Sequence, residues 1–250
     1  DNSGANEYGT IQAAVDAATD GDVIVVESHS SGSYGNVDIN KNNNLADGNS
    51  ITIRAADGAS PTIDGTSDNA VDIQNNIGVT IEGLTLSADD GIDAIVADGL
   101  TVDGQTVSVV DSTINPDGSG NAFGISANDG GTVDAQNVSF VSEDGDSGTS
   151  TEQAGIFAYG ADAVTVSEST FEDLDFGVQA PQVGTVDIQD STFADLSDEG
   201  VIVNNDGQSD YAPTVTISGN EFTTIGTSSS STMVLFLNDD GGSFSTSGTY

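Results

Sequence analysis

A short phrase of alternating apolar and polar residues recurs along the chain. It reads VTIEGLTL, VSVVDSTI, VDAQNVSF, VTVSESTF, VDIQDSTF and VTISGNEF, in copies that begin at Val79, Val107, Val133, Val164, Val186 and Val215. Successive copies begin 22 to 31 residues apart, a spacing typical of stacked structural repeats. Strict alternation predicts that each copy contains a short β-strand with one buried side, so that Val164 and Val166 point inward and Thr165 points outward.

Each copy has a polar or glycine corner followed by a large apolar residue. The corners are Gly83, Asp111, Asn137, Glu168, Asp190 and Gly219. The closing apolar residues are Leu86, Ile114, Phe140, Phe171, Phe193 and Phe222. A further strand follows each copy and usually opens with glycine, as in GIFAY from Gly155. Two or three short strands per turn with such corners are typical of a parallel β-helix, whose closing residues would form an inward ladder.

The opening segment differs from the repeats. Ile11, Ala14, Val15 and Ala18 recur at helical spacing, Thr10 is suited to cap the helix, and Gly21 is expected to end it before a strand over 22–26. A solenoid needs its open end covered, because exposed strand edges recruit other chains. We therefore expect a capping helix and first strand within 8–26.

We expect the coils to fill 27–250, so that 1–250 forms a single domain. The chain begins at Asp1 rather than Met, which fits a processed or trimmed secreted protein. It ends in GGSFSTSGTY without a recognisable C-terminal cap. The expectation is that either the chain is a fragment of a longer one or another molecule covers the last coil.

Three segments near the N-terminus precede the repeats: Thr10 to Val26, SYGNVDINKN from Ser33, and ITIRAADGASPTIDG from Ile51. Together with the repeats they resemble the pectin lyase-like superfamily over nearly the whole chain. The resemblance implies an all-β fold, a right-handed parallel β-helix. That superfamily includes polysaccharide lyases, glycoside hydrolases, carbohydrate esterases, viral tailspikes and adhesins, so a shared fold does not assign an activity.

The charge balance is extreme, with 41 acidic residues against 2 basic ones and a net charge of −39. Carboxylates repel one another across about 10 Å at 0.1 M salt and across only about 3 Å at 1 M. This indicates an extreme halophile, and we expect the protein outside the cell or on its surface. Only Lys41 and Arg54 could neutralise phosphates, so no nucleic-acid partner is expected. No stretch reaches the roughly 20 apolar residues of a membrane span, so no membrane insertion is expected.

The catalytic groups that the resemblance implies have no counterparts here. Lyases of the superfamily use an Arg or Lys base with calcium, whereas Lys41 and Arg54 lie in the first coils. The only histidine is His29, in the N-terminal loop, and FEDLDFG from Phe171 is only superficially similar to the esterase strand. A two-carboxylate glycosidase stays open, because neighbouring coils place acids about 5 to 9.5 Å apart. We expect a non-catalytic protein, with a polysaccharide-active enzyme and a viral receptor-binding spike as alternatives.

Acidic turns are the candidate metal sites. One contains Asp89, Asp90 and Asp93, and another contains Asp144 and Asp146. Carboxylate oxygens suit Ca²⁺, although neither turn matches a complete calcium-loop motif. We expect no cofactor other than this ion. Asn137 begins the one N-glycosylation sequon and falls on a predicted corner.

An apolar stripe is the candidate interface. Inward Ile156 and Ala158 send Phe157 and Tyr159 outward, and the same register exposes Ile202, Leu235 and Leu237. Such a stripe on a carboxylate-rich surface predicts contact with another copy or with a cell-surface glycan or protein. The alternative is that a loop over 142–153 or 204–213 covers it. We expect a role in adhesion, envelope structure or self-assembly.

The charge generates the first prediction. The fold is expected to depend on salt, because screening removes most of the carboxylate repulsion and leaves apolar burial intact. Circular dichroism from about 3 M down to about 0.05 M salt should show a falling unfolding midpoint and then loss of the strand signal. An unchanged midpoint over that range would contradict the halophilic interpretation.

Overall fold

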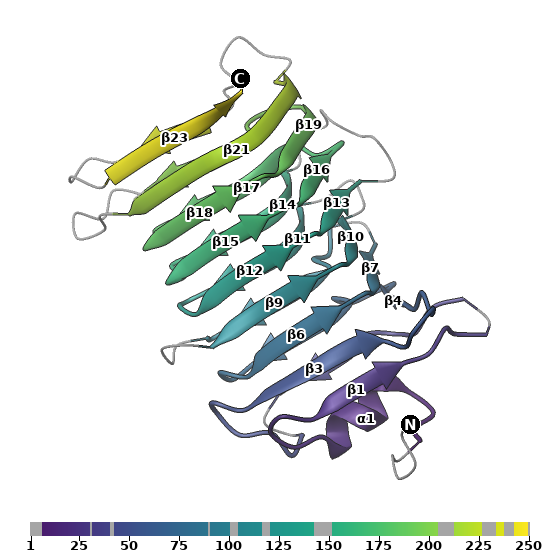
Figure 1. Ribbon diagram of the computed structural model, residues 1–250. Helices are drawn as coiled ribbons and strands as arrows, with labels where there is room; N and C mark the ends of the chain where they lie inside the picture. Colours follow the sequence, from purple (N-terminus) through teal and green to yellow (C-terminus); the bar gives the residue numbers. More distant parts are fainter. Residues whose placement is uncertain are drawn as a thin grey trace.

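The computed structural model describes residues 7–30, 32–40, 43–89, 91–100, 105–116, 121–142, 152–204, 213–226, 234–237 and 243–249; within 235–237 and 243–249 it describes the backbone only. The protein is a right-handed parallel β-solenoid whose coils stack along one axis (Figure 1). Each complete coil has three strands, and strands of neighbouring coils pair in parallel. The predicted fold class is therefore confirmed, with three strands per turn.

The three strands of each coil form three faces. The first face consists of β1 (Val23–Val26), β3 (Ser50–Ala55), β6 (Gly78–Glu82), β9 (Thr106–Val110), β12 (Thr132–Gln136), β15 (Ala163–Ser167), β18 (Thr185–Gln189), the start of β21 (Thr214–Ile225) and β23 (Ser243–Thr249). The second consists of β4 (Thr62–Gly65), β7 (Thr85–Ala88), β10 (Thr113–Pro116), β13 (Ser139–Val141), β16 (Thr170–Glu172), β19 (Thr192–Leu196) and the end of β21. The third consists of β2 (Val37–Ile39), β5 (Val71–Gln74), β8 (Ile95–Asp98), β11 (Ala122–Asn128), β14 (Gln153–Tyr159), β17 (Phe176–Pro181), β20 (Val201–Asn204) and β22 (Val234–Leu237).

The predicted corners join the first face to the second. All six corner residues have φ between 49° and 73°, in the left-handed region. A single left-handed residue turns the chain sharply, and glycine, asparagine and aspartate tolerate this conformation best. Glu168 tolerates it less well, and its backbone N–H donates to the Gln189 carbonyl at 3.2 Å.

A buried polar ladder lies beside these corners and was not predicted. Backbone N–H groups donate to side-chain oxygens of the next coil: Leu84 to Ser112 Oγ, Val138 to Ser169 Oγ, Ser169 to Ser191 Oγ and Ser191 to Asn220 Oδ1, over 2.8 to 3.2 Å. At four corners the next residue is polar, and its side chain satisfies a backbone donor that would otherwise be buried without a partner. After the other two corners, Gly83 and Asn137, this position holds Leu84 and Val138.

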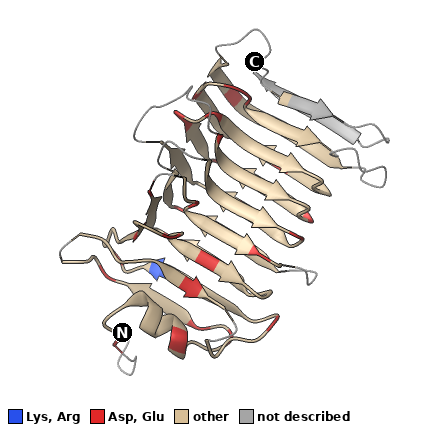
Figure 2. Ribbon diagram, turned by 180° about the vertical axis from the view of Figure 1, so that it is seen from behind, with Lys and Arg blue, Asp and Glu red and all other residues tan. Residues whose placement is uncertain are grey.

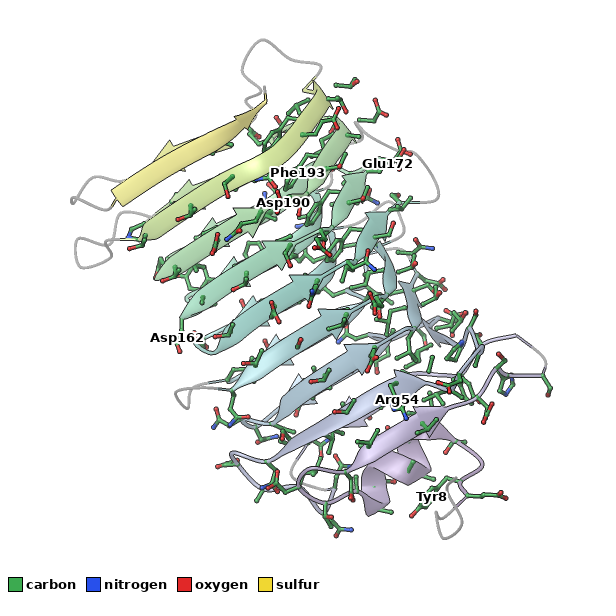
Figure 3. All side chains as sticks on the ribbon, viewed as in Figure 1. Tyr8, Arg54, Asp162, Glu172, Asp190 and Phe193 are labelled. Carbon is green, nitrogen blue, oxygen red and sulfur yellow. The ribbon has the colours of Figure 1, made fainter. Side chains whose placement is uncertain are left out.

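The interior contains the predicted apolar ladder. Val164 and Val166 are fully buried, and the rings of Phe140, Phe171, Phe193 and Phe222 stack with centroids 4.6 to 4.7 Å apart. Figure 3 shows Phe193 between the strands. Because successive coils are about 4.8 Å apart, each ring lies directly on the next. The inward ladder is confirmed.

Glycine occurs near the start of β11, β14 and β17 because the interior has no room for a larger side chain there. A Cβ on Gly124, Gly155 or Gly177 would overlap the ring of Phe140, Phe171 or Phe193, respectively. In the earlier coils, Ala70 and Ala94 occupy the equivalent register, where the closing residues are the smaller Leu86 and Ile114. Alanine therefore goes with an aliphatic closing residue and glycine with phenylalanine, which keeps the packing dense along the solenoid.

The N-terminal end has the predicted helix, α1 (Ile11–Ala17). Thr10 Oγ1 accepts a hydrogen bond from Ala13 N at 3.1 Å, and Ile11 and Val15 are buried against the core. The predicted N-cap is confirmed. The helix ends at Ala17, four residues before Gly21, because Ala18 is already extended, and the strand begins at Val23.

The stacked rings generate the second prediction. Phe193→Ala should lower the free energy of unfolding by about 3 to 5 kcal/mol, because the cavity lies between two rings held by rigid neighbouring coils. Thr192→Ala, on the outward side of the same strand, is the matched control and should cost under about 1 kcal/mol. Denaturant unfolding in high salt measures both. Equal losses would contradict the assigned register.

Candidate interaction face

The third face is divided by charge. Its first strands carry Asp38, Asp72 and Asp98, whereas β11, β14, β17, β20 and β22 contain no acidic or basic residue. Figure 2 views this face and shows red on its strands only toward the N-terminal end. In a chain with 41 acidic residues, five consecutive uncharged strands form a distinct surface.

The strand register places the predicted interface residues in two neighbouring rows. Phe157, Gln179, Ile202 and Leu235 are opposite one another on consecutive strands. Tyr159 lies in the adjacent row of the same face, and Leu237 is opposite Asn204. Phe157, Tyr159 and Ile202 are half-buried on the outer side, while Ile156 and Ala158 are fully buried. The side chains of Leu235 and Leu237 lie outside the described residues.

Two aromatic residues of this face were missed by sequence reasoning. The ring of Phe123 stacks on that of Phe157, with centroids 4.7 Å apart and planes inclined by 14°. Phe176 is buried, with 8% of its surface exposed, but it is not part of the connected apolar cluster inside the solenoid. Strict alternation fails here because the opening glycine and the next apolar residue both point inward, so the residue before the glycine points outward. We call Phe123, Phe157, Tyr159, Phe176 and Ile202 the aromatic strip.

Some polar groups beside the aromatic strip lack hydrogen-bond partners. Gln182 Nε2 donates to Tyr159 Oη at 2.7 Å. In contrast, Gln179 Oε1 and Asn204 Oδ1 are buried and accept no hydrogen bond, and Gln179 as a whole is 9% exposed. A buried acceptor without a donor costs about 1 to 3 kcal/mol. Rearrangement of the strip around a partner that supplies O–H or N–H groups would recover part of that energy.

Carboxyl groups border the strip where the third-face strands begin. Asp93, just before β8, accepts a hydrogen bond from Phe123 N at 2.8 Å, and burial raises the pKa of its carboxyl group. Asp175, just before β17, is buried and accepts from Gln153 N at 3.1 Å and from the Ser197 hydroxyl. Each of these carboxylates binds the backbone at the start of the third-face strand in a neighbouring coil, Asp93 that of β11 and Asp175 that of β14.

Asp198 and Glu199 form a carboxyl pair at the entry to β20. Burial, the charge of Asp198 and a hydrogen bond that protonated Glu199 donates to the Asp198 carboxylate together raise the pKa of Glu199 to about 7. The backbone N–H of Asp198 donates to the Asp175 carbonyl at 3.0 Å, which places the pair beside the strip. Near neutral pH, Glu199 can therefore hold a proton that an ordinary surface glutamate would have lost.

The predicted calcium sites receive no support from the described residues. Among them, no group of three or more Asp, Glu, His or Cys side chains is placed to hold a metal. Asp89 is exposed, and Asp93 binds the backbone of Phe123. Asp90, Asp144 and Asp146 lie outside the described residues, so calcium binding stays a prediction.

The glycosylation prediction is also untested. Asn137 is exposed at a corner with φ of 53°, and its Nδ2 donates to Asp111 Oδ1 at 2.6 Å. The alternative that a loop over 142–153 or 204–213 covers the strip concerns segments that lie largely outside the described residues.

Comparison with protein-family models, curated proteins and solved structures found no match to this chain. In the described part of the chain, no helix has the length and apolarity needed to cross a bilayer. The structure itself defines the class of the protein as a right-handed parallel β-solenoid with a capped N-terminal end and an uncharged, partly aromatic stretch on one face.

The Asp198 and Glu199 pair generates the third prediction. The pKa of Glu199 rises from about 4.5 to about 7 in the folded state, so its protonation stabilises the fold fully below about pH 4.5. That stability is lost as the pH rises through about 7. Thermal unfolding in high salt should show a falling midpoint over this range, and a shallower fall for Glu199→Gln.

Glu82→Gln is the control, because it removes a carboxyl group from the exposed first face. It should keep the wild-type slope. Burial also raises the pKa of Asp72 and of Asp93, so these two carboxyl groups act in the same direction as Glu199. Identical slopes in all three proteins would show that the pair does not titrate in this range.

Proposed function

We propose that this chain is a non-catalytic structural or adhesive protein on the surface of an extreme halophile, and that it contacts its partner through the aromatic strip. The observation that carries the proposal is the uncharged run of third-face strands from β11 to β22. A family relationship to the pectin lyase-like superfamily is part of the proposal and is supported by the solenoid fold alone.

Charge explains why contact would be made there. The chain has a net charge of −39, so most of its surface attracts bound water and repels other acidic surfaces. A partner that covers the strip need not neutralise or desolvate carboxylates on the strands beneath it. Aromatic rings also provide large contact areas at low entropic cost, which is why they concentrate interface energy.

The size of the strip favours a glycan chain or a repeated surface over a single tight protein partner. Four strands at about 4.8 Å, each with about five residues at 3.3 Å, cover roughly 300 to 400 Å². A stable protein complex buries about 800 Å² on each partner. Weak contacts of this size become strong when many copies bind one surface together, as in an envelope layer.

The rival function, cleavage of a polysaccharide, is favoured by one observation. The Asp198 and Glu199 pair lies beside the strip, and a carboxyl group that holds its proton near pH 7 can serve as a general acid. Release of reducing ends from a polysaccharide, abolished in Glu199→Gln, would replace the proposal of a non-catalytic role.

The strip generates the fourth prediction. Replacing both Phe157 and Tyr159 by serine should abolish binding to isolated halophile cell envelopes in high salt, because the stacked ring and the tyrosine are removed together. Sedimentation of labelled protein with the envelopes measures the bound fraction, and circular dichroism checks the fold.

Val96→Ser is the matched control. Val96 is outward in the same row as Phe157 but lies on β8, among the acidic strands. It should bind like the wild type. Full binding by the folded double variant would remove the strip from the proposal.

A further inference from the structure

The N-terminal end of the first face has an open strand edge. Strand β1 pairs with β3 and, among the described residues, with no other strand. Thr52 N donates to Asp22 O at 3.0 Å and Ala56 N to Val26 O at 2.8 Å. In a parallel ladder, alternate residues of a strand bond to one neighbour, so the backbone groups of Val23 and Val25 face the open side.

Apolar side chains gather at this edge. Tyr8, Val23 and Val25 are 42%, 53% and 40% exposed, and they are the large hydrophobic residues that are exposed in the described part of the chain. A groove of about 1180 Å³ lies between α1 and β1, and its charged lining consists of one cation, Arg54, and four acidic residues, Glu7, Asp22, Glu27 and Asp57. Figure 3 shows Tyr8 and Arg54 at this end of the molecule.

This combination differs from an ordinary capped end. Helix α1 covers the core through Ile11 and Val15 but leaves the backbone of β1 accessible. Protein edges are usually protected by charge, proline or a bulge, and VIVV itself has none of these, although Asp22 and Glu27 flank it. A β-branched edge strand beside a groove is suited to accept an added strand, and its acidic surroundings favour one without carboxylates.

We infer that this edge binds a strand of a second copy, namely β23, so that copies join end to end. Strand β23 belongs to the same sheet as β1 and pairs in parallel with β21. All pairings in this sheet are parallel, so a shift of one copy along the solenoid axis brings its β23 beside β1 of the next in the ordinary coil-to-coil relation. Such a joint does not close on itself and would produce linear assemblies.

Charge favours this occupant over other segments of a second copy. The strand sequences VIVV and SFSTSGT contain no carboxylate, whereas the corners and turns are acidic. The cation Arg54 is opposite Val25, immediately beside the joint. Repulsion between the two copies is screened in molar salt, so the joint should form there and weaken on dilution of the salt.

The experiment is light scattering of the whole chain in about 3 M salt across a concentration series. Wild type should grow in mass with concentration. Val23→Lys combined with Val25→Lys should raise the dissociation constant about tenfold or more, because lysine side chains on an edge strand oppose the addition of a further strand and replace the apolar contact that the two valines offer.

The matched control is Ser108→Lys combined with Val110→Lys. These residues occupy the same two outward rows of the first face, on the interior strand β9. Both double variants lose the same amount of negative charge, which by itself would favour association. The control should therefore associate at least as well as the wild type, and only the edge variant should lose association.

A peptide with the sequence of residues 241–250 provides a second measurement that does not depend on folding of the variants. It should occupy the groove and lower the mass of wild-type assemblies, and a scrambled peptide should not. Wild type that stays monomeric, or an edge variant that assembles normally, would overturn the inference. Loss of assembly in the Phe157 and Tyr159 variant alone would assign self-association to the aromatic strip instead.

Discussion

The coil-to-coil register is the constraint on which the rest of this structure depends. Because each coil lies about 4.8 Å above the last, every side chain meets the side chain at the same position in the next coil. A side chain that recurs at one position must therefore pack against copies of itself in the coils above and below. Phenylalanine satisfies this condition inside by stacking, and the facing strands respond with glycine at Gly124, Gly155 and Gly177. Where the closing residue is aliphatic, as at Leu86 and Ile114, the equivalent position on the third face holds alanine instead of glycine.

The same rule restricts charge. A carboxylate on an outward row faces its neighbours across about one coil spacing, so long rows of aspartate would repel strongly. The outward row that contains Asp134 and Asp187 places threonine or serine beside each. Among the described residues, most acidic side chains fall outside the strands. The uncharged strands of the third face and of β1 follow this tendency, to which Asp38 and Asp72, directly opposite each other on β2 and β5, are an exception.

Alternation, corners and closing residues were sufficient to predict the solenoid, because each is a local feature that repeats.

The residues Phe123 and Phe176 were missed for a different reason. Their outward direction depends on the glycine that follows, and that glycine depends on a phenylalanine of the next coil. The pairing of Asp198 with Glu199, and its effect on the pKa of Glu199, likewise arise from burial that no single strand pattern contains. Alternation alone had predicted Phe157 and Ile202 in one outward row, and the register between β14, β17 and β20 adds that Gln179 lies between them.

The aromatic strip and the β1 edge have different consequences for an acidic protein. The strip lies along the side of the solenoid, so contact there leaves both ends accessible. The β1 edge lies at an end, so contact there lengthens the sheet and repeats the strip at regular intervals along the assembly. Since one strip covers too little area for a tight complex, end-to-end joining would supply the multiple contacts that a weak strip needs. The two proposals are therefore independent in their residues and complementary in their energetics.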